Sequence, residues 1–179
     1  MSQQMITLGG GCFWCVEAVY ELVDGVTAVE NGYCNGQVVD PSYEAVCTGT
    51  TGHAEVVRVS FDDERILLRE ILEIFFAVHD PTTLNRQGND VGTQYRSGIY
   101  FETAAQEAVA REVLAEARQQ FGAHGAQVVT ELQPLADYSR AEAYHQHYFA
   151  NHPHQGYCAF VVAPKVEKFR RTYKARLRA

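Results

Sequence analysis

Three consecutive glycines followed by a cysteine constrain this chain most strongly. Gln4 to Leu8 has the pattern of a short strand, and this strand runs into Gly9-Gly10-Gly11. The apolar residues that follow are spaced for one face of a helix, which Gly25 would end: Phe13, Val16, Tyr20 and Val23. The pattern therefore predicts a strand, a tight glycine turn and a helix, with Cys12 at the turn.

A thiol in this position has particular chemistry. At a helix N-terminus it faces unpaired backbone N–H groups and the positive end of the helix dipole, which favour the reactive thiolate. Cys15 lies three residues further on, so it can meet Cys12 across the first helical turn. Two alternatives remain open: a pair of buried inert thiols, or a zinc site completed by Cys34 and Cys47, although a second closely spaced pair is absent from the sequence.

Composition indicates an ordinary globular protein. The chain has 179 residues, of which 46% are apolar and 21% charged, so we expect one compact domain over residues 1–179. No segment is apolar enough to span a bilayer, no secretory signal is visible, and five cysteines fit a reducing compartment, so we expect a cytoplasmic protein. A net charge of -7 argues against a nucleic-acid partner. The basic C-terminal segment fits a solvated helix end, and we expect a monomer.

Strands and helices intermix without strict βαβ repetition. Strands are expected at 26–33, 57–61, 95–101 and 127–132, and an apolar helix at 66–78 ends before Asp80-Pro81. Thr103 with Gln106 forms a capping box for a helix to Gln120, and Ser139 with Glu142 forms another for a helix to about Phe149. Pro164 suits the first turn of a last helix. We predict an α+β domain of two layers, with a mixed or antiparallel central sheet packed by helices.

Three sequence blocks resemble a known family. Gly11-Cys12-Phe13-Trp14 resembles the active-site signature of the peptide methionine sulfoxide reductases of the A class, which act on the S epimer. The segments from Tyr43 to Glu55 and from His79 to Ser97 resemble the same family, in the same order and at similar spacing. The resemblance runs from about Gly9 to Phe169, and it implies a two-layer α+β fold, in agreement with the pattern above.

The resemblance also implies roles for individual residues. Cys12 matches the nucleophile, and Glu55 matches the acid that protonates the sulfoxide oxygen. The other matches are hydroxyl donors, a polar residue that lines the site and the wall around the substrate methyl group: Tyr43 and Tyr95, Asp90, and Phe13 with Trp14. Taken singly, each of these residues also fits an ordinary structural role. Their joint occurrence with Cys12 favours the functional interpretation.

The chemistry explains these residue types. A thiolate can attack sulfoxide sulfur, but oxygen leaves poorly unless it is protonated. Glu55 can be the acid only if burial raises its pKa enough to keep it protonated near neutral pH. Tyrosine hydroxyls can stabilise the developing charge on oxygen as hydrogen-bond donors. Cys12 becomes a sulfenic acid as methionine leaves, a second thiol condenses with it, and the resemblance implies that a dithiol protein such as thioredoxin reduces the disulfide.

The second thiol is either Cys15 or Cys158. Many family members carry glycine at the position of Cys15, and Cys158 matches a position where many carry the resolving cysteine in a mobile, Gly-rich tail. Here the following residues, 159–162, are apolar and are expected to be ordered, with strand as one option. An ordered tail reaches the site only by local unfolding, which favours Cys15. We expect Cys47 to be structural, and we assign no role to Cys34.

Two other functions compete with this interpretation. A cysteine pair at a helix start also fits a general thiol–disulfide oxidoreductase, but disulfide exchange does not need Glu55, Tyr43 and Tyr95. A zinc-stabilised or methionine-binding module is the non-catalytic alternative. The late histidines hint at metal, but His145 and His147 would not share a helix face. We therefore expect no cofactor, no metal and no membrane partner, and methionine sulfoxide, free or in proteins, as substrate.

Overall fold

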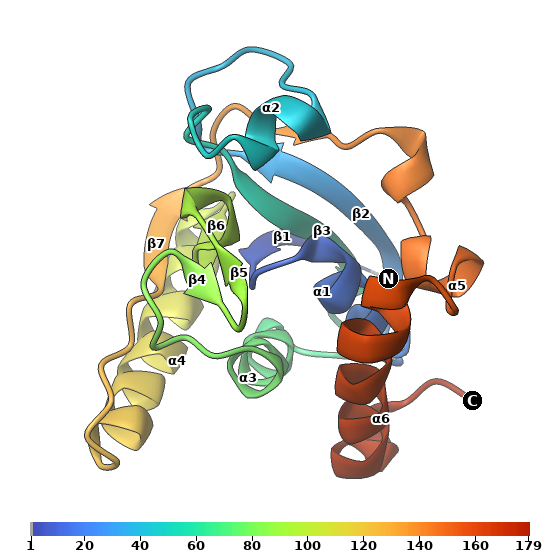
Figure 1. The fold of residues 1–179 in the computed structure, drawn as a ribbon. Coiled ribbons are helices and arrows are strands. Elements are labelled where there is room, and N and C mark those ends of the chain that lie inside the picture. Colours follow the sequence, from blue (N-terminus) through green and yellow to red (C-terminus); the bar gives the residue numbers. More distant parts are fainter. Residues whose placement is uncertain (1) are drawn as a thin grey trace.

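A six-stranded sheet forms the centre of the protein (Figure 1). The computed structural model describes residues 2–179. The strand order is β7-β6-β1-β3-β2-β8, and neighbouring strands are antiparallel except for the parallel pair β6 and β7. The strands are β1 (Gln3–Gly9), β2 (Val26–Cys34), β3 (Ala54–Asp62), β6 (Gly98–Phe101), β7 (Glu131–Pro134) and β8 (Ser139–Arg140). This mixed sheet confirms the predicted fold class.

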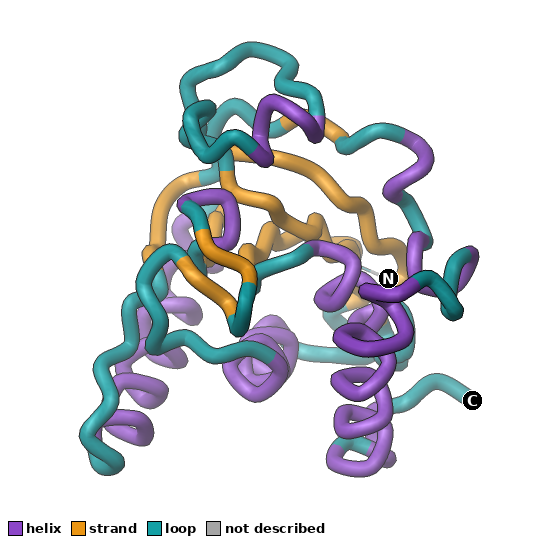
Figure 2. The backbone as a smooth tube through the Cα atoms, in the orientation of Figure 1, coloured by secondary structure: helices purple, strands orange, loops and turns teal. Residues whose placement is uncertain are grey.

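Helices and a small hairpin surround the sheet. In the view of Figures 1 and 2, α3 and α6 lie below the central strands, whereas α2 lies above them. The hairpin consists of β4 (Arg86–Gln87) and β5 (Asp90–Val91). The helices are α1 (Phe13–Tyr20), α2 (Tyr43–Cys47), α3 (Leu68–Val78), α4 (Ala104–Gly122), α5 (Tyr148–Asn151) and α6 (Ala163–Thr172). Short 3₁₀ turns cover residues 93–95, 143–145 and 174–176, and a π-helical turn covers residues 158–162.

The main core forms where α3 packs against the sheet. The spacing of Ile71, Leu72 and Phe75 places all three on one face of α3, and each is completely buried. On the sheet, Ile6 of β1 lies opposite Val59 of β3, and both are also completely buried. Burying side chains of this size contributes about 1.5–3 kcal/mol each. The two central strands, which carry the catalytic candidates at their ends, are thus firmly held.

One predicted helix is wrong. Ser139 does not cap a helix, because it pairs with Tyr33 at the sheet edge as part of β8. The Glu142 carboxylate is also engaged elsewhere, since it accepts hydrogen bonds from the Tyr33 hydroxyl at 2.9 Å and from the Tyr43 backbone N–H at 2.9 Å. Long-range partners therefore replace the local capping box.

Several other helices and strands begin or end at residues that differ from the prediction. The first helix stops at Tyr20, before Val23, and the strand expected from Tyr95 begins at Gly98, after a 3₁₀ turn. The strand expected at 127–132 is β7, which begins at Glu131. The apolar residues 159–162 are ordered, but they are helical and not a strand. Pro164 lies in the first turn of α6, as predicted.

Candidate active site

The glycine turn positions Cys12 at the start of α1. Gly11 has φ +92°, and a Cβ atom there would lie 2.6 Å from Cγ of Gln87, so both the backbone and the close packing require glycine. Cys12 is the N-cap residue, and its carbonyl accepts a hydrogen bond from the Cys15 N–H at 3.1 Å. Figure 2 shows the short connection between β1 and α1 that carries this turn. The nucleophile candidate is therefore held by rigid elements on both sides.

Cys12 and Cys15 form a hydrogen-bonded thiol pair. Both are buried, with Cys12 8% and Cys15 4% exposed. Burial and the hydrogen bond to Cys15 raise the pKa of Cys12. The hydrogen bond from Cys12 lowers the pKa of Cys15, and the charge of Lys165 adds to this effect. Burial and the neighbouring Cys15 thus oppose the thiolate that the sequence predicts at Cys12, and Cys15 is the thiol of the pair whose pKa is lowered.

Glu55 faces this pair from β3. Its side chain is 1% exposed, and its Oε1 accepts a hydrogen bond from the Phe13 N–H at 3.2 Å. Within residues 2–179, the buried Oε2 atom has no hydrogen-bond partner. Burial raises the pKa of Glu55 to about 8, so the carboxyl group is largely protonated at neutral pH. It can therefore donate a proton to a bound ligand.

Two tyrosines lie near the Glu55 carboxyl group. Tyr43 is the first residue of α2, whose N-cap Ser42 accepts a hydrogen bond from the Ala45 N–H, and Tyr95 ends a 3₁₀ turn. Burial, followed by the charge of Glu55, raises the pKa of both tyrosines. Their hydroxyl groups therefore remain protonated and available as hydrogen-bond donors.

Asp90 joins the site through a residue that the sequence analysis missed. Its Oδ2 accepts a hydrogen bond from the Tyr157 hydroxyl at 2.6 Å, which links the β4–β5 hairpin to the C-terminal segment. Burial raises the pKa of Tyr157, and the nearby Cys12 and Cys15 add to this shift. The signal available in the sequence was the position of Tyr157 next to Cys158.

Trp14 and Phe13 have different environments. Phe13 is completely enclosed, and its ring centre lies 6.2 Å from that of Tyr43. Trp14 is half-buried and stacks on Tyr148, with ring centres 4.0 Å apart. The indole Nε1 of Trp14 donates a hydrogen bond to Nδ1 of His145 at 3.1 Å. Trp14 is thus a partly exposed ring whose orientation is fixed by its neighbours, whereas Phe13 is a core residue beside it. His145 and Tyr148 were not predicted as parts of the site.

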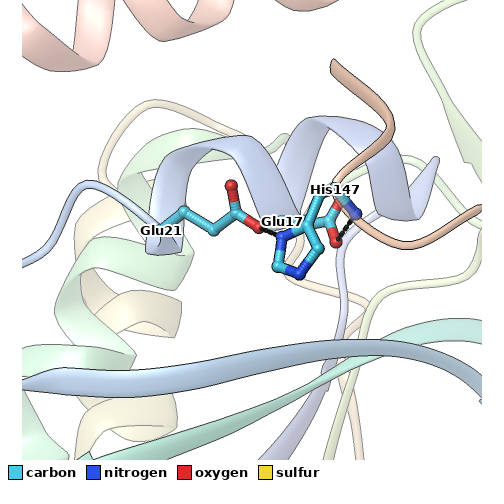
Figure 3. A group of neighbouring side chains, drawn as sticks. All are labelled: Glu17, Glu21 and His147. Carbon is cyan, nitrogen blue, oxygen red and sulfur yellow. Dashed lines mark hydrogen bonds and ion pairs between the residues drawn. The ribbon is translucent and has the colours of Figure 1, made fainter. Parts of the chain in front are cut away.

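A buried carboxylate attaches the His145–Tyr148 segment to α1. Glu17 accepts hydrogen bonds from the backbone N–H of His147 at 2.7 Å and of Tyr148 at 3.2 Å. His147 Nδ1 donates to Glu21 Oε1 at 2.5 Å (Figure 3). Glu17, Glu21 and His147 offer three potential metal-ligand atoms within 4.8 Å of one another. Because Glu17 and Glu21 already accept hydrogen bonds from this segment, we assign the cluster a structural role. It holds in place the segment that carries Tyr148, on which Trp14 stacks.

The three other cysteines differ in their access to the site. Cys158 is completely buried and packs in one apolar cluster with Cys12 and Cys15. Cys47 is exposed at the end of α2, where its thiol is hydrogen-bonded to Tyr43. Cys34 is buried in a separate cluster with Tyr100. Among residues 2–179, the four cysteines of the alternative zinc site are therefore not brought together: Cys12, Cys15, Cys34 and Cys47.

Comparison with known proteins identifies the family. The model of the family described as peptide methionine sulfoxide reductase matches residues 4–177. The chain belongs to this family. The peptide methionine sulfoxide reductase MsrA of Polynucleobacter asymbioticus is 54% identical over 94% of this chain and 88% of its own length. MsrA of Saccharolobus solfataricus is 53% identical over 95% of this chain and 94% of its own.

Solved methionine sulfoxide reductases share the fold. Methionine sulfoxide reductase A of Corynebacterium diphtheriae superposes with a TM-score of 0.83 at 35% identity, covering 88% of this chain and 78% of its own. Reduced Mxr1 of Saccharomyces cerevisiae gives a TM-score of 0.81 at 38% identity, covering 87% and 89%. The chain is thus a peptide methionine sulfoxide reductase, an oxidoreductase that acts on methionine sulfoxide. Among residues 2–179, no helix is both long and apolar enough to cross a membrane.

Proposed function

We propose that this enzyme reduces the S epimer of methionine sulfoxide, peptide-bound or free, with Cys12 as nucleophile and Glu55 as acid. The observation that carries the proposal is the buried, protonated Glu55 carboxyl group, whose Oε2 atom has no partner in the described chain, beside the Cys12–Cys15 pair. A general disulfide oxidoreductase has no use for such an acid. In cells, the reaction repairs oxidised proteins within a single catalytic domain.

The first step transfers oxygen from the substrate sulfur to Cys12. Cys12 gives its proton to Cys15 in its thiolate form, which the lowered pKa of Cys15 favours, and the Cys12 sulfur attacks the substrate sulfur. Glu55 protonates the substrate oxygen, and the Tyr43 and Tyr95 hydroxyl groups stabilise the charge that develops there. The bond formed between the two sulfur atoms breaks as the hydroxyl group moves from the substrate sulfur to the Cys12 sulfur, so methionine leaves and Cys12 becomes a sulfenic acid. Sulfur of the substrate is reduced by two electrons, which Cys12 supplies.

Three fixed directions explain why one epimer is favoured. Cys12 sets the direction of attack, Glu55 and the tyrosines set the position of oxygen, and Trp14 provides the wall for the methyl group. When the attack direction, the oxygen and the methyl group are all fixed around the sulfoxide sulfur, only one position remains for the rest of the methionine side chain. The mirror-image epimer cannot meet the three requirements together. The family resemblance assigns the accepted epimer as S.

Cys15 is the proposed resolving thiol. Its sulfur lies in hydrogen-bond contact with Cys12, so it attacks the sulfenic sulfur without a change of fold and releases water. Cys158 is completely buried in a helical segment that continues into α6, and it does not reach solvent without local unfolding. The structure of Mxr1 in complex with Trx2 supports a thioredoxin-type dithiol protein as the reductant of the disulfide.

Single-turnover reduction tests the proposal. Reduced enzyme is mixed with either the S or the R epimer of a peptide methionine sulfoxide, without external reductant, and the methionine formed is measured. We expect about one methionine per enzyme from the S epimer, no product from the R epimer, and no product from Cys12→Ser. Product from Cys12→Ser, or equal rates with both epimers, would overturn the proposal.

A further inference from the structure

A cavity of about 560 Å³ lies between the end of α3, the end of α4 and α6, and it shares Gln87 and Lys165 with the surroundings of Cys12 and Cys15. This volume falls within the range of about 300–1,000 Å³ that is typical of small-molecule sites. Four aromatic side chains and two lysines contribute to its wall: Phe76, Phe121, Phe169, Tyr173, Lys165 and Lys168. The cavity thus combines aromatic surface with positive charge, and the reaction described above uses none of the four rings.

Among residues 2–179, the two lysines outnumber the one carboxylate on this wall, although the charge of Lys165 also acts on the buried Cys15 thiol. No ion pair or hydrogen bond joins the ammonium group of Lys165 or Lys168 to residues 2–179, and Lys165 is half-buried. The one carboxylate on the wall belongs to Asp80, and it is engaged in its own turn, where it accepts hydrogen bonds from the Thr82 N–H and hydroxyl group. The lysines and Asp80 together give this wall a net positive charge, which favours an anion.

The aromatic residues of the wall indicate which chemical group should be attached to the anionic group of the ligand. The rings of Phe169 and Tyr173 stack with centres 5.1 Å apart, and Phe76 and Phe121 also line the cavity. Flat aromatic groups pack well against such rings in offset or edge-on arrangements. A small, strongly hydrated anion such as phosphate would leave this apolar surface uncovered. The wall therefore favours a ligand with both an anionic group and an aromatic body.

We propose that this cavity is a second ligand site, which binds a small aromatic monoanion, a carboxylate or a sulfonate. The anionic group pairs with Lys165 and Lys168, and the aromatic body packs against the partly exposed rings of Phe121 and Tyr173. The proposal does not depend on the roles assigned to Cys12, Cys15 or Glu55, because its test measures ligand binding and not the reduction of methionine sulfoxide.

A fluorescence titration tests the site on the full-length protein. The probe is 8-anilinonaphthalene-1-sulfonate, and N-phenyl-1-naphthylamine is the matched probe with a similar aromatic body and no charge. We expect saturable binding of one sulfonate per chain, displaced competitively by 2-naphthoate. The uncharged probe should bind at least about tenfold more weakly, a factor that corresponds to about 1.4 kcal/mol.

Four variants locate the binding. Lys165→Met and Lys168→Met remove the charge and keep the length of the side chain, and each should raise the Kd for the sulfonate about tenfold. Lys174→Met is the matched control, because Lys174 is exposed outside the cavity. Ala77→Trp introduces a ring from an exposed position on the wall and should abolish binding while the enzyme stays folded and active. An unchanged Kd in Lys165→Met and Ala77→Trp, or equal affinity for the uncharged probe, would overturn the proposal.

Discussion

The backbone N–H of Phe13 donates a hydrogen bond to one oxygen of Glu55 at 3.2 Å, and the other oxygen has no hydrogen-bond partner among residues 2–179. The residue beside the proposed nucleophile therefore fixes the direction of the proposed acid. Since the peptide N–H fixes Oε1, the proton is directed toward Oε2 and into the site. One local geometry, the start of α1, thus orientates both reacting groups.

Replacing the acid should slow the chemical step. Glu55→Gln keeps the size of the side chain but cannot transfer a proton, so we expect single-turnover methionine formation to slow by about 10²–10⁴-fold. Rapid-quench measurement of methionine at neutral pH checks this. Glu44→Gln, on the exposed surface of α2, is the matched control and should leave the rate unchanged. A Glu55→Gln rate within twofold of the parent would remove Glu55 from this role.

The rate should also depend on pH in one direction. Burial raises the pKa of Glu55 to about 8, so the protonated, proton-donating form is lost as pH rises through about 8. The single-turnover rate should therefore be high near neutral pH and fall about tenfold for each pH unit well above 8. In Glu55→Gln this alkaline decrease should disappear. A decrease of the same shape in both proteins would assign it to another group.

The two candidate resolving cysteines should behave differently. In Cys15→Ala, methionine should still form in the first turnover, more slowly because the base for Cys12 is lost, and recycling by a thioredoxin-type protein should stop. Cys158→Ala should recycle at nearly the parent rate, because the proposed disulfide joins Cys12 to Cys15, with which it is already hydrogen-bonded. Multiple-turnover assays and mass spectrometry of the disulfide check both variants. Normal recycling in Cys15→Ala, or its loss in Cys158→Ala alone, would transfer the role to Cys158.

Removing the aromatic wall should mainly weaken substrate binding. Trp14→Ala deletes the half-buried ring that stacks on Tyr148, and loss of such contact costs about 1–2 kcal/mol. We expect KM to rise about tenfold or more, with a smaller change in kcat. Phe160→Ala removes an aromatic ring that is 83% exposed and serves as the control. Steady-state kinetics with a peptide sulfoxide make the comparison. Unchanged KM in Trp14→Ala would show that another surface holds the methyl group.

Local patterns in the sequence were sufficient for the elements that position the thiols. The turn between β1 and α1 was predictable because three glycines leave few alternatives, and β3 was visible in the alternation of Val57 and Val59. The helix expected from Ser139 failed because its capping signal is local. The competing partners of Glu142, namely Tyr33 and Tyr43, come from distant parts of the chain. Only the fold brings such partners together.

The same distinction applies to the site. Motifs were sufficient to propose Cys12 and Glu55 as catalytic candidates, but they could not reveal the opposite pKa shifts of Cys12 and Cys15, which depend on burial and on Lys165 of α6. His145 and Tyr148 were also unrecognisable, because their role depends on stacking and hydrogen bonding with Trp14 across more than 130 positions of sequence.

The buried position of Cys158 has a kinetic consequence. Under the proposed scheme, the tail does not carry a disulfide outward, so the reductant must approach the same opening that admits the oxidised methionine. Substrate and reductant then exclude each other and take turns, which gives parallel lines in double-reciprocal plots and inhibition of each half-reaction by an excess of the other partner.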